Sequence, residues 1–195
     1  MSKRLDAQMA FLNEADKLKS IVRATTLCDG SRHENSGEHS WHIALYAMVL
    51  ADQAGKDVDI NRVIKMLLIH DLVEIDAGDA PIFGDYDAAA LAAEEAAAAT
   101  RIFGLLPPDQ ATAFRALWDE FEAAETPSAQ FAKSLDRFQP PMQNLQSGGG
   151  SWTDYNVSQD QIAQKVGSKI AIGAPSLWAY AKARIATFFE HRQGL

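Results

Sequence analysis

A histidine, an aspartate and a glutamate lie close together in an apolar stretch of the sequence, "LLIHDLVEI". On a helix His70 and Glu74 share a face, and Asp71 lies about 100° round from His70, so all three could line one cavity. Burying such groups is costly unless they are paired or bound to a metal ion. An imidazole beside a carboxylate suits a divalent ion, and a second carboxylate could orient water bound to that ion. A buried polar pair without metal stays the alternative for this segment alone.

Two other segments could complete such a site. "ENSGEHSWH" places His39 and His42 at the start of another apolar helix, where one of them could join the coordination shell. "FAKSLDRF" embeds Asp136 between apolar residues, although Asp136 could instead pair with Arg137 or Lys133 at the surface. Each segment has a structural explanation by itself. Taken together, the three segments favour a metal site over separate structural pairs.

The elements that must position these residues are predicted to be helical, because nearly every apolar stretch follows helical spacing. We expect an all-α fold with helices at about 6–23, 38–55, 59–75, 88–104, 109–124, 128–146 and 175–191. Asp59 is the expected N-cap of the third helix. Pro140 and Pro141 are expected to bend or interrupt the sixth. Residues 79–87 are predicted to form a loop over a pocket, and "SGGGS" at 147–151 to be a flexible connector.

Composition and charge narrow the possible functions. With 195 residues and 47% hydrophobic residues, we expect a single globular domain. The formal net charge of -8 argues against polymeric nucleic acid and anionic membranes as partners. No uninterrupted apolar run predicts a signal peptide or a membrane-spanning helix. The single cysteine, Cys28, rules out an intramolecular disulfide, and we expect a cytoplasmic protein.

The pattern H…HD…D, spaced as His39, His70, Asp71 and Asp136, resembles the HD-domain metal-dependent phosphohydrolases. "RHENSGEHSWHIALYA", "IHDLVEIDAGDAP" and "FAKSLDRF", in this order, resemble the 5′-deoxynucleotidase (YfbR-like) branch of that family. The likeness covers about residues 10–145, and a helical extension of about residues 152–195 follows. It implies one HD domain over residues 1–195, a helical bundle with its metal site between the core helices.

The resemblance also implies a role for each matched residue. One divalent cation (manganese, cobalt, iron, zinc or magnesium) would be bound by His39, His70, Asp71 and Asp136. His42 would lie outside that shell. Glu74 would act with Asp71 in catalysis, by orienting or deprotonating the attacking water. Two further residues would bind substrate. Arg23, at the end of the first predicted helix, would bind the phosphate, and Asp79 would bind the sugar. The chain has no histidine between Asp71 and Phe189, which favours a single-metal site.

The expected reaction is removal of the 5′-phosphate from (deoxy)nucleoside 5′-monophosphates. In the bacterial branch a tryptophan linked to deoxyribose selection follows the arginine, whereas this chain has Ala24, which leaves the sugar preference open. Arg32 and His33 could add phosphate or base contacts, or lie in a solvated loop. The alternatives are hydrolysis of another small phosphorylated metabolite or nucleoside triphosphate, and a non-catalytic module stapled by metal. We expect a homodimer, with the aromatic C-terminal helix as interface or as core cover.

Overall fold

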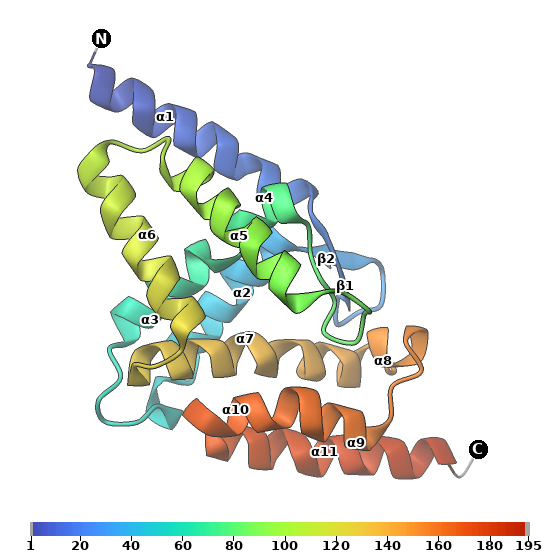
Figure 1. Cartoon of the computed structure of the whole chain (residues 1–195). Coiled ribbons are helices and arrows are strands. Elements are labelled where there is room, and N and C mark those ends of the chain that lie inside the picture. The colour runs from blue at the N-terminus through green and yellow to red at the C-terminus, as the bar shows by residue number, and fades with distance from the viewer. Residues whose placement is uncertain (1, 194–195) are drawn as a thin grey trace.

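Helix α7, Pro127–Gln146, is the element around which the other helices are arranged (Figure 1). It packs against α2, α3, α6, α10 and α11, and its buried face includes Phe131 and Leu135. The Thr126 side chain accepts a hydrogen bond from the backbone N–H of Ala129, which caps the start of the helix. Helices α5 and α6 lie on one side of α7, and α10 and α11 lie on the other (Figure 1).

This computed structural model describes residues 2–193. Its α-helices and strands are α1 Lys3–Ala15, β1 Val22–Thr26, β2 His33–Asn35, α2 Ser36–Val49, α3 Ile60–Ile69, α4 Glu74–Ala77, α5 Ala88–Phe103, α6 Pro108–Ala123, α7 Pro127–Gln146, α8 Ser151–Asp154, α9 Gln159–Ile162, α10 Ser168–Gly173 and α11 Pro175–Gln193. Shorter helical turns are Asp16–Ser20, Ala51–Gln53 and His70–Val73, and a π-helical turn is Ala163–Gly167. The predicted all-α class is therefore confirmed, with a small two-stranded hairpin added to it.

The hairpin corrects the prediction for the first helix. Instead of continuing to residue 23, α1 ends at Ala15, and a 3₁₀ turn leads to the extended Ile21. Val22 then pairs with Asn35, and Thr26 with His33, in an antiparallel ladder. Arg23 accordingly lies on strand β1 and not at a helix end. Valine and threonine in this segment favour extended backbone, and the ladder partner comes from beyond the next loop, where helical periodicity gives no signal.

The two helices that carry the histidines differ from their predicted boundaries. Helix α2 begins at Ser36, where Asn35 and Glu38 form a capping box, and it ends at Val49, before the predicted Gly55. Helix α3 has the predicted cap, since the Asp59 side chain accepts from the N–H of Arg62. It ends at Ile69, and His70–Val73 form a 3₁₀ turn before α4. The segment predicted as one helix is thus three consecutive helical pieces.

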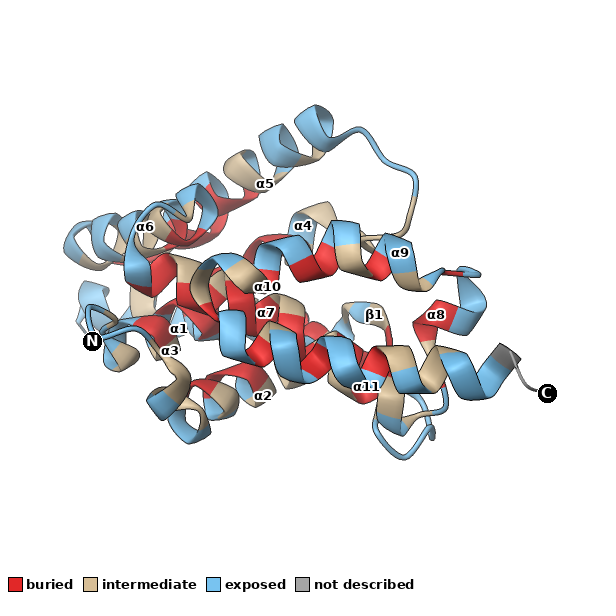
Figure 2. Cartoon of the chain, turned by 90° about the horizontal axis from the view of Figure 1, so that it is seen from below, coloured by how far each residue is buried: buried red, intermediate tan, exposed pale blue. Residues whose placement is uncertain are grey.

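The site region lies where two apolar clusters meet. One cluster joins α2, α3, α7, α10 and α11, and includes Leu67. The other joins α1, α5, α6 and the turn after α3, and includes Leu72. His70 and Asp71 lie between these two leucines in the chain. Buried residues are concentrated along α7 (Figure 2).

The end of α7 and the glycine run after it differ from expectation. Pro140 and Pro141 do not end the helix, which continues to Gln146. The glycines 148–150 all have positive φ angles and form an ordered turn. A Cβ at Gly150 would lie 2.5 Å from Asn144 Oδ1, which accepts from the Ser151 N–H. This segment is therefore a tight, hydrogen-bonded turn and not a flexible connector.

The C-terminal segment covers the core. Trp152, Ile162 and Ile170, which precede α11, are fully buried, and Phe188 of α11 packs edge-on against Trp152. The aromatic residues of the last helix were expected either to form an interface or to cover the core, and these contacts match the second role. Within residues 2–193, the helices are too short or too polar to cross a membrane.

Candidate functional site

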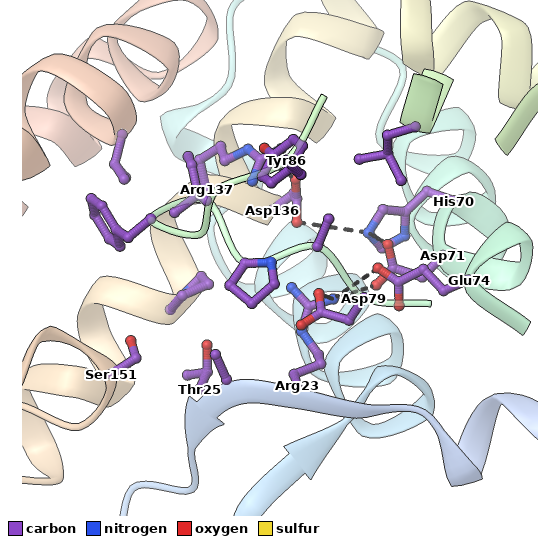
Figure 3. A pocket seen from close by; sticks show the side chains of 18 of the residues that line it. Arg23, Thr25, His70, Asp71, Glu74, Asp79, Tyr86, Asp136, Arg137 and Ser151 are labelled. Carbon is purple, nitrogen blue, oxygen red and sulfur yellow. Dashed lines mark hydrogen bonds and ion pairs between the residues drawn. The ribbon is translucent and has the colours of Figure 1, made fainter. Parts of the chain in front are cut away.

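Two histidines and two aspartates from three elements meet in the interior. Figure 3 shows three of them, His70, Asp71 and Asp136. His39 comes from α2, His70 and Asp71 from the 3₁₀ turn, and Asp136 from α7. His39 Nε2 is 3.1 Å from Asp136 Oδ1 and 4.0 Å from Asp71 Oδ2. His70 Nε2 is 2.9 Å from Asp71 Oδ1 and 3.7 Å from Asp136 Oδ1. All four residues are buried. The four predicted metal ligands are thus brought together at one point.

The hydrogen bond at Nδ1 of each imidazole determines whether its Nε2 can bind a metal ion. His70 Nδ1 is 2.9 Å from the carbonyl oxygen of Leu67, which can only accept, so Nδ1 carries the proton. His39 Nδ1 is 3.1 Å from the side-chain oxygen of Gln139, which likewise accepts. In neutral imidazoles both Nε2 atoms then offer lone pairs to the centre, where carboxylate oxygens also converge. Two imidazole nitrogens and two carboxylates that all direct lone pairs to one point suit a divalent cation. The residues therefore fit the expected metal ion. His39, His70 and Asp136 each present an atom within 4.8 Å of the others.

The electrostatics of the metal-free site follow from burial and close charges. Burial disfavours the charged form of His70, but Asp71 and Asp136 outweigh it and raise its pKa to about 10. Burial works against ionisation of Asp71 as well, yet His70 and Arg23 hold the pKa of that carboxyl well below its usual value. In the absence of an ion, a proton on His70 therefore supplies part of the positive charge that the two aspartates require.

Glu74 lies beside the cluster on the first turn of α4. Burial, followed by the charge of Asp71, raises the pKa of Glu74 well above its usual value. The Ser36 hydroxyl donates a 2.5 Å hydrogen bond to Glu74 Oε2. The other oxygen, Oε1, lies 3.5 Å from Arg23 Nη1. Glu74 is thus held on both oxygens, with its carboxylate next to the metal-ligand cluster.

Arg23 is surrounded by the acids of the site. Its Nη1 donates to Asp71 Oδ2 at 2.9 Å and lies 3.6 Å from Asp79 Oδ1. Burial disfavours the charge on Arg23, but these carboxylates outweigh it and raise its pKa above the usual value. Burial also raises the pKa of Asp79. A buried guanidinium beside a metal-ligand cluster is suited to bind an oxyanion.

A cavity of about 290 Å³ opens onto these groups (Figure 3). One end is lined by the polar set Arg23, His70, Asp71, Glu74, Asp79 and Asp136. The predicted loop contributes Phe83 and Tyr86, and the C-terminal segment contributes Ser151, Trp152 and Tyr155. Ala24, where the resemblance leads one to expect a tryptophan, is on the lining as well. The cavity therefore joins this charged group to a region lined by aromatic side chains and by further charged ones, among them Arg137 and Lys133.

Three further residues considered from the sequence do not line this cavity. The Arg32 guanidinium forms an exposed ion pair with Glu38. His33 is exposed on β2, with Nδ1 3.1 Å from the carbonyl oxygen of Ala24. His42 Nδ1 lies 3.2 Å from Gln139 Nε2, outside the ligand cluster. Arg32 and His33 are therefore solvated, as the solvated-loop explanation predicts, although His33 lies on strand β2 and not in a loop.

Sequence reasoning missed three polar residues that hold the site. Ser36 bonds Glu74, Gln139 bonds His39, and Glu34 is buried behind both His39 and Arg23. Glu34 and Ser36 lie in the segment that contains His39, so their short spacing from that histidine was an available signal. Gln139 lies three residues after Asp136, one turn along the same helix, which places both on one face.

Comparisons with known proteins agree with the family that the sequence motifs resemble. A family model described as "HD domain" matches residues 15–178. The human protein named 5′-deoxynucleotidase HDDC2 is 28% identical over 130 residues, 66% of this chain and 62% of that protein. The zebrafish (Danio rerio) protein of the same name is 26% identical over 162 residues, 80% of each chain. The chain therefore spans less than two thirds of the human relative's length.

Solved structures show the same similarity. A crystal structure described as a "Predicted metal-dependent phosphohydrolase" from Magnetospirillum magnetotacticum MS-1 superposes with a TM-score of 0.90 at 48% identity, over 97% of each chain. A Pyrococcus horikoshii protein has a TM-score of 0.63 at 21% identity, over 90% of this chain and 99% of that one. The second likeness shows a shared fold only.

Proposed function

The chain belongs to the HD domain family, and from that membership we propose that it is a metal-dependent phosphohydrolase that removes the 5′-phosphate from nucleoside 5′-monophosphates. The observation that carries the proposal is one cavity whose charged end combines a metal-ligand cluster, a buried arginine and a buried glutamate. Curated relatives named 5′-deoxynucleotidase support the substrate class.

The residues that would hold the ion are His39, His70, Asp71 and Asp136. Mixed imidazole and carboxylate ligation accepts manganese, cobalt, iron, zinc or magnesium, and availability often decides among them. When bound, the ion polarises a phosphoryl oxygen and lowers the pKa of its water. Leu67 and Gln139 hold the two imidazoles in the required tautomer.

Arg23 would bind the phosphate. Its guanidinium can give two parallel hydrogen bonds to a phosphate, and it lies at the border between the ligand cluster and the open cavity. The negative charges that now surround it, Asp71 and Asp79, keep it ionised. A phosphate bound there would leave the rest of the cavity open to the nucleoside.

Glu74 would orient the attacking water and accept its proton. Burial raises the pKa of this carboxyl, so it takes up a proton more readily than an exposed glutamate, as a general base must. Ser36 holds one carboxylate oxygen of Glu74, and the other oxygen lies 3.5 Å from Arg23 Nη1. Asp79, at the edge of the cavity, would accept a hydrogen bond from a sugar hydroxyl.

The sugar preference depends on the region around Ala24. A methyl side chain leaves more room at this point of the lining than the bulky residue of the bacterial branch. We therefore propose that ribonucleotides are accepted beside deoxyribonucleotides. Other small phosphorylated metabolites and nucleoside triphosphates are the competing substrates.

The experiment is phosphate release from a panel of deoxy- and ribonucleoside 5′-monophosphates, with manganese, cobalt, magnesium or a chelator. Release of inorganic phosphate from monophosphates with added metal supports the proposal. Release of pyrophosphate or triphosphate from nucleoside triphosphates, with no action on monophosphates, would replace it with the competing substrate class. Metal binding with no turnover of any phosphate compound would favour the non-catalytic module.

The assembly and location expected from the sequence stay predictions. A homodimer is supported by large apolar side chains exposed on α2, including Trp41, Met48 and Val49. Exposed apolar area of this kind often belongs to an interface. Light scattering on the purified protein measures the mass directly. The cytoplasmic location is tested by fractionation of the source cells.

A further inference from the structure

Glu34 is a buried carboxylate that the proposed reaction does not use. It lies on strand β2 and is 1% exposed. Its Oε2 accepts hydrogen bonds from Gln139 Nε2 and from Gln143 Nε2, each 3.1 Å long. Its Oε1 lies 3.5 Å from His39 Nδ1 and 3.6 Å from Arg23 Nε. A carboxylate in the interior requires such compensation, because burying an unpaired charge is costly.

All four groups that face Glu34 are donors. The two amide nitrogens donate to Oε2, and the arginine Nε and the imidazole Nδ1 lie within 3.6 Å of Oε1, so the ionised carboxylate is the side chain that suits the position. Within the described residues, Glu34 Oε1 and Arg23 Nε have no hydrogen-bond partner and lie opposite each other.

Glu34 also determines how Gln139 is oriented. Because Glu34 Oε2 can only accept, the Nε2 end of the Gln139 amide faces it. The oxygen end then faces His39 and accepts the Nδ1 proton at 3.1 Å. Glu34 therefore acts on His39 directly through Oε1 and also through the Gln139 amide.

Resting on the proposed function, we infer that Glu34 is a positioning residue that holds a metal ligand and the phosphate-binding arginine from the side opposite to the substrate. His39 presents Nε2 to the cluster, and its Nδ1, which donates to Gln139, lies 3.5 Å from Glu34. Arg23 presents Nη1 to Asp71 and Nε to Glu34. A hydrogen-bond acceptor on the outer nitrogen of a ligating histidine fixes the tautomer and increases its basicity, and loss of such a partner weakens metal binding. On His39 this acceptor is the Gln139 oxygen, which Glu34 orients.

The competing explanation is that Glu34 only joins β2 to α7 through Gln139 and Gln143. Both explanations predict a less stable protein when Glu34 is changed. Only the positioning role predicts weaker metal binding in protein that is still folded. The test therefore measures metal affinity and melting temperature separately.

The experiment is calorimetric titration of manganese(II) into chelator-treated wild type and the Glu34→Gln variant. Glutamine keeps the size of the side chain but replaces one carboxylate oxygen with an NH₂ group, which faces the N–H groups around this position. We expect the manganese Kd to rise about 10- to 100-fold and the KM for a nucleoside monophosphate to rise with it. Nitrogen NMR of His39 should also show loss of the single Nδ1–H tautomer. Unchanged manganese affinity in folded Glu34→Gln protein would overturn the inference.

Two further variants complete the design. Glu38→Gln is the matched control, because Glu38 is four residues away, faces the exposed Arg32, and glutamine still fits its capping box. Its manganese affinity should equal that of wild type. Where Glu34→Gln does not fold, Gln143→Met carries the test, since it removes one donor to Glu34 and touches neither His39 nor Arg23. We expect its Kd to rise about threefold, and an unchanged Kd would count against the inference.

Wild-type results separate this inference from the proposed function. If wild-type protein binds manganese but hydrolyses no monophosphate, the substrate proposal fails and the affinity comparison still tests Glu34. If wild type hydrolyses monophosphates and Glu34→Gln binds manganese normally, the inference about Glu34 fails alone.

Discussion

The Ser36 hydroxyl donates a 2.5 Å hydrogen bond to Glu74 Oε2, and it joins the first residue of α2 to the first residue of α4. Both side chains are buried. The contact links the helix that carries His39 to the carboxylate assigned to the attacking water. Orientation of Glu74 therefore depends on a residue that touches neither metal ligands nor substrate in the proposed mechanism.

Replacing Ser36 by alanine should lower kcat about tenfold, because a hydrogen bond to a charged group contributes about 1.5 kcal/mol or more. KM and manganese affinity should change little, since Arg23 and the ligand cluster are untouched. Steady-state kinetics measures kcat and KM separately. Ser40→Ala is the matched control: Ser40 is buried on the same helix, and among the described residues its hydroxyl has no hydrogen-bond partner. An equal loss in both variants would contradict the role of Ser36.

Replacing Glu74 by alanine should lower kcat about 10²- to 10⁴-fold, the range expected for loss of a general base. Metal binding should persist, because Glu74 is not among the four ligands, so calorimetry with manganese provides the check. Glu94→Ala, an exposed glutamate on α5, serves as control. Retained turnover in Glu74→Ala would mean that another group activates the water.

Replacing Arg23 by lysine should lower kcat/KM about 10- to 100-fold, because lysine keeps the charge but loses the planar, two-pronged donor geometry. The loss should appear mainly in KM if Arg23 binds phosphate in the ground state. Arg4→Lys, on an exposed arginine paired with Asp109, is the control. Unchanged kinetics of Arg23→Lys would show that phosphate binds elsewhere in the cavity.

Metal binding should release a proton. With its pKa raised to about 10 in the metal-free protein, His70 is protonated at neutral pH, and an ion can bind its Nε2 only after that proton leaves. Apparent metal affinity should therefore rise with pH from neutrality toward about 10. Titrations in two buffers of different ionisation enthalpy measure the number of protons released. Equal heats in both buffers would contradict a protonated His70.

Much of the site was predictable because its chemistry is local in sequence. His70, Asp71 and Glu74 lie within five residues, and their apolar surroundings mark them as buried. Helix ends marked by side-chain caps, such as Asp59, were equally accessible. Helical spacing alone placed these residues near one cavity.

The features that were missed depend on contacts between distant segments. Arg23 lies on a strand whose partner strand is beyond the next loop. The local pattern of apolar residues does not indicate that pairing. The 3₁₀ turn at His70 arises where the chain passes between two apolar clusters. Glu34 resembles any polar residue of a turn until α7 brings Gln139 and Gln143 against it.

The most direct test of the central claim is release of inorganic phosphate from deoxyadenosine 5′-monophosphate by manganese-loaded protein, compared with the same sample after chelation and after manganese is restored. The proposed mechanism predicts release that disappears with the chelator, returns with manganese, and is absent in the Asp136→Asn variant of the buried ligand. Release that persists in chelated protein, or that survives in Asp136→Asn, would contradict it.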